Sequence, residues 1–219
     1  MAHDAARPGL DRARVVAAAV RFIDEYGLGE LTMRRLGAYL GVEGMALYRY
    51  VPGREALLDA VADAVADEVG SLPEGWVEHL RRLAHGMRRV ALAHPEVFPL
   101  VATRPAAAPL IRPPLRSPRA VESLLRVLKA AGFPDDAAAA VYRSFSGFLL
   151  GHLLLEVTAA GMETVSEQIP DIPPIVRRLR PQLTADRAAV DFEEALDALL
   201  SRAEARHRPR LGLPRIPQE

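Results

Sequence analysis

The sequence contains no cysteine and few aromatic residues. None of its 219 residues is Cys, which excludes disulfides and thiol chemistry and is typical of a protein from a reducing compartment. Aromatic residues make up 5% of the chain, although 50% of it is hydrophobic. The core must therefore be built from Leu, Val and Ala, which together with Arg and Glu favour helix.

Long apolar runs are also missing. The first fourteen residues lack the apolar stretch of a secretory signal. The longest apolar run, residues 147–155, is interrupted by His152 and is far too short to span a bilayer. Alternating Val-rich segments separated by turn signals are absent, which argues against a β-rich fold. We therefore expect an all-α, cytoplasmic protein that does not enter a membrane.

An excess of charge of either sign is absent as well. Lys and Arg number 28, and so do Asp and Glu, so the formal net charge is zero. Residues 1–54 contain eight Arg against six acidic residues, a local net charge of +2. Binding to nucleic acid would therefore need a local patch of positive charge, because the chain as a whole carries no net positive charge.

Apolar spacing and capping residues predict the helices of the first 70 residues. We expect helices over 11–26 and 32–40, a short helix from Glu43 or Gly44, and a regular helix over 54–69. Asp11 and Thr32 are the expected N-caps. The sequence Val51-Pro52-Gly53 stops the short helix, because proline restricts the residue before it.

The rest of the chain is predicted to be helical too, with one proline-rich interruption between residues 95 and 118. The helix ending near residue 160 is apolar around nearly its whole circumference, so it must be buried on more than one side. The tail from 207 is basic and proline-punctuated, which is typical of disorder. The expected helices cover residues 76–94, 119–131, 134–160, 174–180 and 184–205. The expected domains are 1–70, 71–206 and the tail 207–219.

Residues 31–58 have the pattern of a helix-turn-helix: helix, glycine turn, short helix, break, new helix. A recognition helix must approach the major groove closely and present donors to bases and phosphates. Small residues at its start and basic or hydroxyl groups further on meet that demand. In the alternative interpretation, Tyr48 and Tyr50 are half-buried core residues of a helical hairpin. The candidate DNA contacts are Thr32, Met33, Arg34, Gly44, Met45, Ala46, Tyr48, Arg49, Tyr50 and Arg54.

The stretch LTMRRLGAYLGVEGMALYRYVPGREALLDAV resembles the DNA-binding domain of the TetR-type regulators. The helix at Trp76, the string Ala102-Thr103-Arg104-Pro105 after a His-Pro turn, the Gly132-Phe133 break and the segment DIPPIVRRL are similar to the C-terminal domain of the tetracycline repressors. The resemblance implies an Ω-shaped helical homodimer that binds a palindromic double-stranded operator and is released by a small molecule. It also implies that the helices near 135–160 and 184–205 form the dimer bundle.

The same resemblance implies a ligand pocket in the C-terminal domain. Met87, Leu100 and Phe148 are explained at least as well as core residues, and Thr103 and Arg104 could hold the loop instead of a ligand. Leu100 stands where the family has a metal-binding histidine, and Leu83 where it has a polar drug contact. We therefore expect an apolar effector and neither a metal nor a cofactor. The candidate ligand contacts are Leu83, Met87, Leu100, Thr103, Arg104, Phe148 and His152.

No catalytic pattern is visible, so we do not expect an enzyme. A glycine-rich phosphate loop and a nucleophile elbow are absent. His79, His85 and His94 are spaced so that they do not share a helix face as a metal pair would. The leading hypothesis is a ligand-responsive transcriptional repressor. The alternative is a helical ligand-carrying or interaction protein whose reading head, the helix-turn-helix of residues 31–58, no longer binds DNA.

Overall fold

The computed structural model describes residues 10–104, 110–160, 172–183 and 187–207. The described residues form helices and turns, and none of them lies in a β-strand, so the predicted all-α fold is confirmed. The chain divides into two compact units. The first contains residues 1–71 and 85–118, and the second contains residues 72–84 and 119–219.

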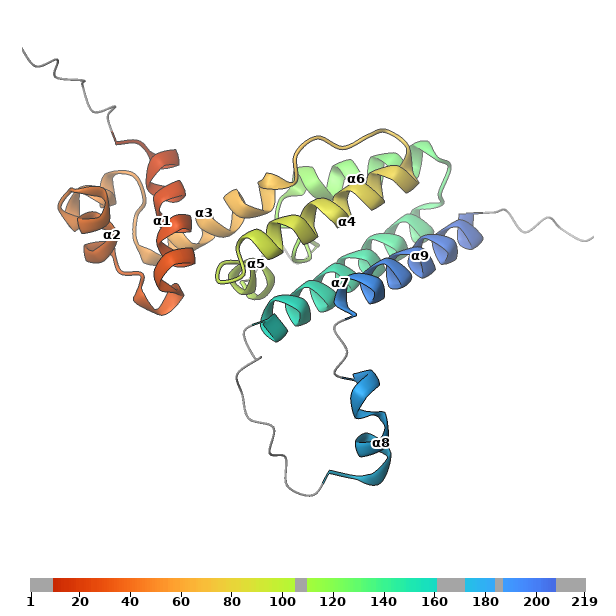
Figure 1. Cartoon of the computed structure of the whole chain (residues 1–219). Helices are drawn as coiled ribbons and strands as arrows, with labels where there is room; N and C mark the ends of the chain where they lie inside the picture. Colours follow the sequence, from red (N-terminus) through yellow and green to blue (C-terminus); the bar gives the residue numbers. More distant parts are fainter. Residues whose placement is uncertain (1–9, 105–109, 161–171, 184–186, 208–219) are drawn as a thin grey trace, which may run out of the picture. The chain divides into compact units, whose positions relative to one another are not determined.

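The first unit begins with three α-helices, each followed by a short 3-10 helix (Figure 1). The predicted N-caps are confirmed, since Asp11 accepts from the Arg14 amide and Thr32 from the Arg35 amide. Gly41 ends the second α-helix in the left-handed conformation, at φ 71°, where glycine carries no Cβ penalty. The elements are α1 (Arg12–Tyr26), η1 (Leu28–Glu30), α2 (Met33–Leu40), η2 (Gly44–Arg49), α3 (Arg54–Ala66) and η3 (Asp67–Val69).

The core of this unit joins the apolar faces of α1 and α3 to one residue each from α2 and η2. Most of its fully buried side chains are aliphatic, as the scarcity of aromatic residues predicts, and Phe98 is the aromatic exception. Burying such faces stabilises short helices that would be marginal alone. Side chains of 0% exposure include Val15, Ile23, Leu36, Leu47, Leu57 and Val61.

Helix α4 (Trp76–Ala93) begins in the second unit and ends in the first. It carries the predicted apolar stripe, with Leu80, Leu83, Met87 and Val90 all buried. Because the helix crosses from one unit to the other, the domain boundary expected near residue 70 stays a prediction. After α4 the chain forms the short helix α5 (Phe98–Thr103), which fits the exclusion of a long helix from the proline-rich passage.

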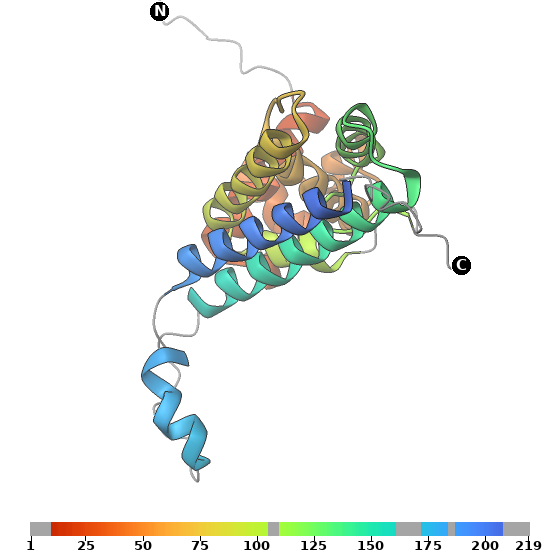
Figure 2. The ribbon, with the colours of Figure 1, turned by 90° about the vertical axis from the view of Figure 1, so that its right-hand side faces the viewer.

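The second unit contains α6 (Pro118–Ala130), α7 (Asp135–Ala160), α8 (Pro174–Leu183) and α9 (Ala188–His207). Helices α7 and α9 pack along each other in opposite directions (Figure 2). Phe145, Leu149 and Leu153 of α7 and Phe192 and Leu196 of α9 are fully buried. By length and composition alone, Asp135–Ala159 is apolar enough to cross a membrane. Core helices share that composition, and the contact with α9 supports the core interpretation.

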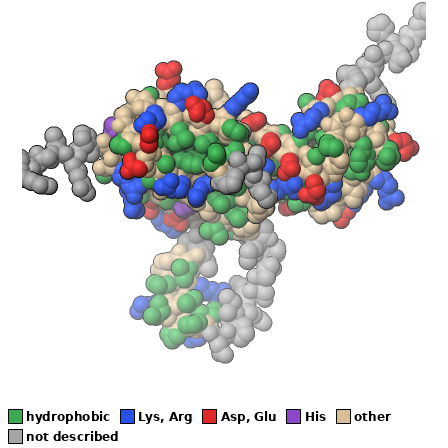
Figure 3. All heavy atoms as spheres, turned by 180° about the vertical axis from the view of Figure 1, so that it is seen from behind, with side chains coloured by type: hydrophobic (Ala, Val, Ile, Leu, Met, Phe, Trp, Pro, Cys, Tyr) green, Lys and Arg blue, Asp and Glu red, His purple; other side chains and the backbone are tan. Residues whose placement is uncertain are grey.

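Helix α8 is amphipathic, and all of its residues are exposed. Figure 3 shows hydrophobic side chains gathered on it beside arginines. Ile175, Val176, Leu179 and Leu183 lie at helical spacing and are 40–66% exposed. The helix continues through Pro181 to Leu183, three residues past its predicted end.

Helix α9 also differs from the prediction at both ends. It begins at Ala188 instead of residue 184, and the predicted start lies among the residues outside the described part. It ends at His207, where the tail was expected to begin. The His207 ring stacks on Phe133 with centroids 4.5 Å apart, which explains why the helix continues to this residue. Residues 161–171, which lie between the helices predicted over 134–160 and 174–180, and the tail from 208 lie outside the described residues.

Candidate nucleic-acid interface and ligand site

The helix-turn-helix is held together by a contact between two glycines. A Cβ on Gly37 of α2 would lie 2.8 Å from the Cα of Gly44 in η2, and a Cβ on Gly44 would lie 3.0 Å from the Cα of Arg34. Gly37 has no room for a side chain because the obstructing atoms are backbone, and a Cβ on Gly44 would be tighter than an ordinary van der Waals contact. Gly44 was predicted to let the backbone approach DNA, and its small size also suits the close contact with α2. The sequence did not identify Gly37 as part of this contact.

Most of the candidate DNA contacts have exposed side chains. Met45 is 76% exposed and Tyr48 is 46% exposed, whereas Leu47 between them is fully buried. Leu47 is therefore the side chain by which η2 is anchored in the core, in addition to the contact of Gly44 with α2. With Tyr48 46% exposed and Tyr50 half-buried, the alternative in which both are half-buried residues of a helical hairpin stays open. The other exposed candidates are Thr32, Arg34, Arg49 and Arg54, and Met33, Gly44 and Ala46 are half-buried.

Arg54 has structural partners within the first unit. Its Nε donates to the Leu31 carbonyl at 3.0 Å and its Nη2 to the Leu28 carbonyl at 3.5 Å. Its Nη1 lies 3.6 Å from a carboxylate oxygen of Glu55. Arg54 therefore ties the start of α3 to the segment that precedes α2. The predicted phosphate contact would use the part of the guanidinium that stays exposed, and it remains a prediction.

The candidate ligand residues are distributed over both units. Met87 and Leu100 in the first unit and Leu83 in the second are at most 5% exposed. Phe148 and His152 lie in the second unit with ring centroids 4.9 Å apart, and Phe148 also contacts Phe192 at 5.2 Å. These contacts fit a core role as well as a ligand role. Their assembly into one ligand site stays a prediction.

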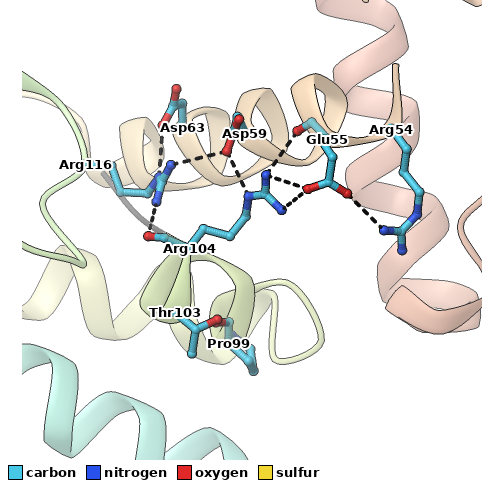
Figure 4. A network of polar contacts seen from close by, with 8 residues as sticks. All are labelled: Arg54, Glu55, Asp59, Asp63, Pro99, Thr103, Arg104 and Arg116. Carbon is cyan, nitrogen blue, oxygen red and sulfur yellow. Dashed lines mark hydrogen bonds and ion pairs between the residues drawn. The ribbon is translucent and has the colours of Figure 1, made fainter. Parts of the chain in front are cut away.

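Thr103 and Arg104 both make internal contacts. The Thr103 hydroxyl donates to the Pro99 carbonyl at 2.7 Å, inside α5. Arg104 reaches α3, where its Nε donates to Asp59 at 2.8 Å and its Nη1 and Nη2 to Glu55 at 3.1 Å (Figure 4). The hydrogen bond to Asp59, followed by the one to Glu55, raises the pKa of Arg104. These contacts favour the loop-holding role for Arg104.

A groove of about 500 Å³ lies between α1, α3 and the end of α4 in the first unit. Small residues such as Ala13, Ala17 and Ala64 line it beside charged groups. None of the candidate ligand residues lines this groove. At its edge the two ring nitrogens of His94 lie 2.8 Å from Asp24 and 3.1 Å from Glu68. Burial lowers the pKa of His94, but the two carboxylates outweigh it and the net shift is upward.

A helix-turn-helix with an exposed basic face at the start of an all-helical chain defines a DNA-binding protein of the helix-turn-helix class. Two family models match the chain. "Bacterial regulatory proteins, tetR family" matches residues 15–61, and "Tetracyclin repressor-like, C-terminal domain" matches residues 69–205. The chain therefore belongs to the TetR family, with a tetracycline repressor-like C-terminal domain.

Curated relatives agree with this assignment. The tetracycline repressor protein class D of Escherichia coli is 30% identical over 199 residues, which cover 87% of this chain and 88% of that protein. The HTH-type transcriptional repressor DrrR1 of Streptomyces coeruleorubidus is 32% identical over 149 residues, 66% of this chain. The match spans about half of DrrR1, 53% of its length.

Solved structures show the same fold. A possible TetR family regulator from Streptomyces coelicolor A3(2) has a TM-score of 0.70 and 32% identity, covering 89% of this chain and 99% of that one. The TetR family protein ActR from Streptomyces coelicolor, in complex with (S)-DNPA, has a TM-score of 0.70 and 26% identity, covering 91% and 99%.

Proposed function

We propose that this protein is a ligand-responsive transcriptional repressor that binds a palindromic operator as a homodimer and is released by a small apolar effector. It acts in the cytoplasm and catalyses no reaction. The observation that carries the proposal is the exposed face formed by α2 and η2, on a chain of the TetR family. Relatives support it: one is called a tetracycline repressor, and ActR has been solved with a bound small molecule.

Helix α7 supports the dimer. Its sequence is apolar on all sides, yet its outer residues are open in a single chain: Leu155 is 72% exposed and a Cβ on Gly147 or Gly151 would meet nothing within 4 Å. An apolar helix face is stable in water when a second copy covers it. The expected bundle therefore consists of α7 and α9 from two copies.

Release follows from a difference in affinity. An effector lowers operator affinity only if it binds more tightly to a state in which the two reading heads are wrongly separated. Half-sites one DNA turn apart are about 34–36 Å apart, so a small displacement of α3 breaks the register. Leu83 and Leu100 are apolar and buried, which favours an apolar effector over a hydrated metal chelate. Tight binding of tetracycline with magnesium would contradict that choice.

Selection of duplexes from a random-sequence pool tests the function. The full-length protein should enrich a palindrome, and Arg49→Ala should bind that duplex at least about tenfold more weakly, because an arginine contact to DNA is lost. Arg126→Ala on α6 is the matched control, since Arg126 is exposed and pairs with Glu122 one turn away on the same helix. Both variants should dimerise normally. Failure of the unaltered protein to enrich any duplex would favour the alternative of a non-functional reading head.

A further inference from the structure

Arg116 is a buried arginine outside the helices of the first unit. It belongs to the segment 110–117, which we call the strap, and its side chain is 5% exposed. Ile111 and Leu115 of the strap are also buried, at 4% and 1%. A guanidinium that leaves water must find partners to offset the cost of desolvation. The partners of Arg116 therefore show what the strap is attached to.

Those partners lie on α3 and at the end of α5 (Figure 4). The Nε of Arg116 donates to Asp63 at 3.0 Å, and its Nη2 lies 4.0 Å from Asp59. Its Nη1 donates to the main-chain carbonyl of Arg104 at 3.1 Å. Arg116 thus holds the turn after α5 and the side of α3 with one planar group, for which a lysine would be a poor substitute.

The carboxylates form one acidic face on α3. Glu55, Asp59 and Asp63 recur at four-residue spacing, so they lie above one another on the helix. Arg104 binds the first two and Arg116 the last two, with Asp59 shared between them. Two arginines, one at the end of α5 and one in the strap, therefore fasten α3 along most of its length.

The opposite end of α3 is attached to the reading head. Glu55 accepts from Arg104 through one carboxylate oxygen and lies close to Arg54 through the other. Arg54 in turn donates to the carbonyls of Leu28 and Leu31, just before α2. A continuous series of polar contacts therefore runs from the strap to the start of the helix-turn-helix.

We propose that Arg116 is a positioning residue of the regulator, which fixes α3 and hence the spacing between half-sites that the dimer accepts. The inference rests on the proposed function, and it adds a residue that touches neither DNA nor effector. Without Arg116 the strap loses its hydrogen bonds to Asp63 and to the Arg104 carbonyl. Arg104 alone then holds the acidic face of α3 through Glu55 and Asp59, and α3 gains freedom to move. If α3 moves more freely, the dimer accepts a wider range of half-site spacings. It therefore discriminates less between operators that differ in spacing.

The first test is hydrogen exchange of the free protein, which does not depend on DNA binding. Arg116→Met keeps a long apolar stem and removes the guanidinium. It should raise amide exchange in residues 44–66 by about tenfold, as expected when a charge-assisted hydrogen bond is lost and local opening becomes easier. Arg81→Met is the control, because it removes the 2.6 Å ion pair with Asp197 in the second unit. Unchanged exchange in residues 44–66 would overturn the proposal whether or not the protein binds DNA.

The second test uses the selected duplex and versions with one base pair added to or removed from its centre. Arg116→Met should reduce the affinity ratio between the best spacing and the altered ones severalfold, and Arg116→Lys should restore part of the ratio. A merely structural role would lower affinity for all duplexes equally, which would contradict the proposal. If Arg116→Met does not fold, Asp63→Ala removes the acceptor of the same contact from the exposed side. This variant must also reduce the affinity ratio between the best spacing and the altered ones. If the unaltered protein binds no duplex, the proposed function is contradicted. The role of Arg116 in holding α3 is then decided by the hydrogen-exchange result alone.

Discussion

At the scale of single residues, the most constrained positions of the reading head are two glycines. Glycine inside a helix usually costs about 1 kcal/mol relative to alanine, so Gly37 in the middle of α2 needs a reason. The structure supplies it, since a Cβ there would collide with the backbone of Gly44 and with the Val42 carbonyl at 2.9 Å. The position of η2 against α2 therefore depends on the absence of two side chains.

Replacing glycine by alanine inside a helix usually stabilises a protein, but we expect Gly37→Ala to destabilise this one. We expect it to lower the free energy of unfolding by about 1–3 kcal/mol, the usual cost of overpacking, and to weaken DNA binding by displacing η2. Urea unfolding and a DNA titration measure the two effects. Gly29→Ala is the control, because a Cβ there meets nothing within 4 Å, and its unfolding free energy should change by less than about 0.5 kcal/mol. Equal stability of both variants would show that the glycine contact is not tight.

His94 predicts a dependence of stability on pH. Its folded-state pKa is raised above the ordinary value of 6.5 by Asp24 and Glu68, against the effect of burial. The folded protein then binds the proton more tightly than the unfolded chain does. The stabilisation is fully present below pH 6.5 and is lost as the pH rises through the raised pKa. His94→Gln should therefore cost more unfolding free energy at about pH 5.5 than at about pH 8.5.

His79 provides a control of the opposite sign. Burial lowers its pKa, although its hydrogen bond to the Pro73 carbonyl works the other way. The stabilisation from this neutral histidine is present above pH 6.5 and is lost as the pH falls through the lowered pKa. Urea unfolding of His94→Gln and His79→Gln over the same pH range should give difference curves of opposite slope. Parallel curves would mean that the carboxylates do not hold the His94 proton.

At the scale of elements, local signals predicted most of the fold. Asp11 and Thr32 cap the helices that they were expected to cap, and Gly41 and Gly132 end helices in which the apolar pattern stops. These signals act over a few residues, so the sequence displays them directly. The end of α9 at His207 was missed because it depends on a stacked ring contact with Phe133, which the local pattern does not show.

The contacts that build the candidate sites were harder to predict. The Gly37–Gly44 contact and the Arg116–Asp63 pair join residues 7 and 53 positions apart, and no periodicity marks such partners. The acidic spacing of Glu55, Asp59 and Asp63 was visible in the sequence, and it could have indicated that basic partners exist. It could not show that they come from the proline-rich passage, because long-range pairing is decided by tertiary packing.

Helix α7 carries a prediction about self-association. Ser144, Gly147, Gly151, Leu155 and Thr158 form an exposed stripe of mostly small residues. Gly151→Leu has room within a single chain and improves helix propensity, so the monomer should not lose stability. In a symmetric dimer both copies bring the leucine to the interface, and association should weaken by about tenfold or more. Sedimentation over a concentration series measures this.

The control is Ala130→Leu, a similar increase in size at an exposed position near the end of α6. It should leave the association constant unchanged. Normal dimerisation of Gly151→Leu would place the dimer contact on another face of the second unit, and the proposed bundle of α7 and α9 would be wrong.

At the scale of the whole molecule, the absence of net charge determines how DNA binding responds to salt. With 28 basic and 28 acidic residues, the chain as a whole does not attract a polyanion. Any salt dependence must then come from individual arginines that neutralise phosphates, each contributing about −0.9 to the log–log slope. A dimer presents each such arginine twice, so single substitutions have effects large enough to measure.

Arg49→Gln should therefore make the slope of the logarithm of affinity against the logarithm of salt concentration shallower by about 1.8 for the dimer. It should weaken binding to all duplexes similarly, because phosphate contacts carry no base information. Arg34→Gln should instead change which base is preferred, if its side chain is on the base side. Fluorescence titrations at several salt concentrations, with Arg126→Gln as the control of equal charge change, separate the two roles. An unchanged slope for Arg49→Gln would remove Arg49 from the phosphate contacts, and a shallower slope for Arg126→Gln would show that overall charge governs binding after all.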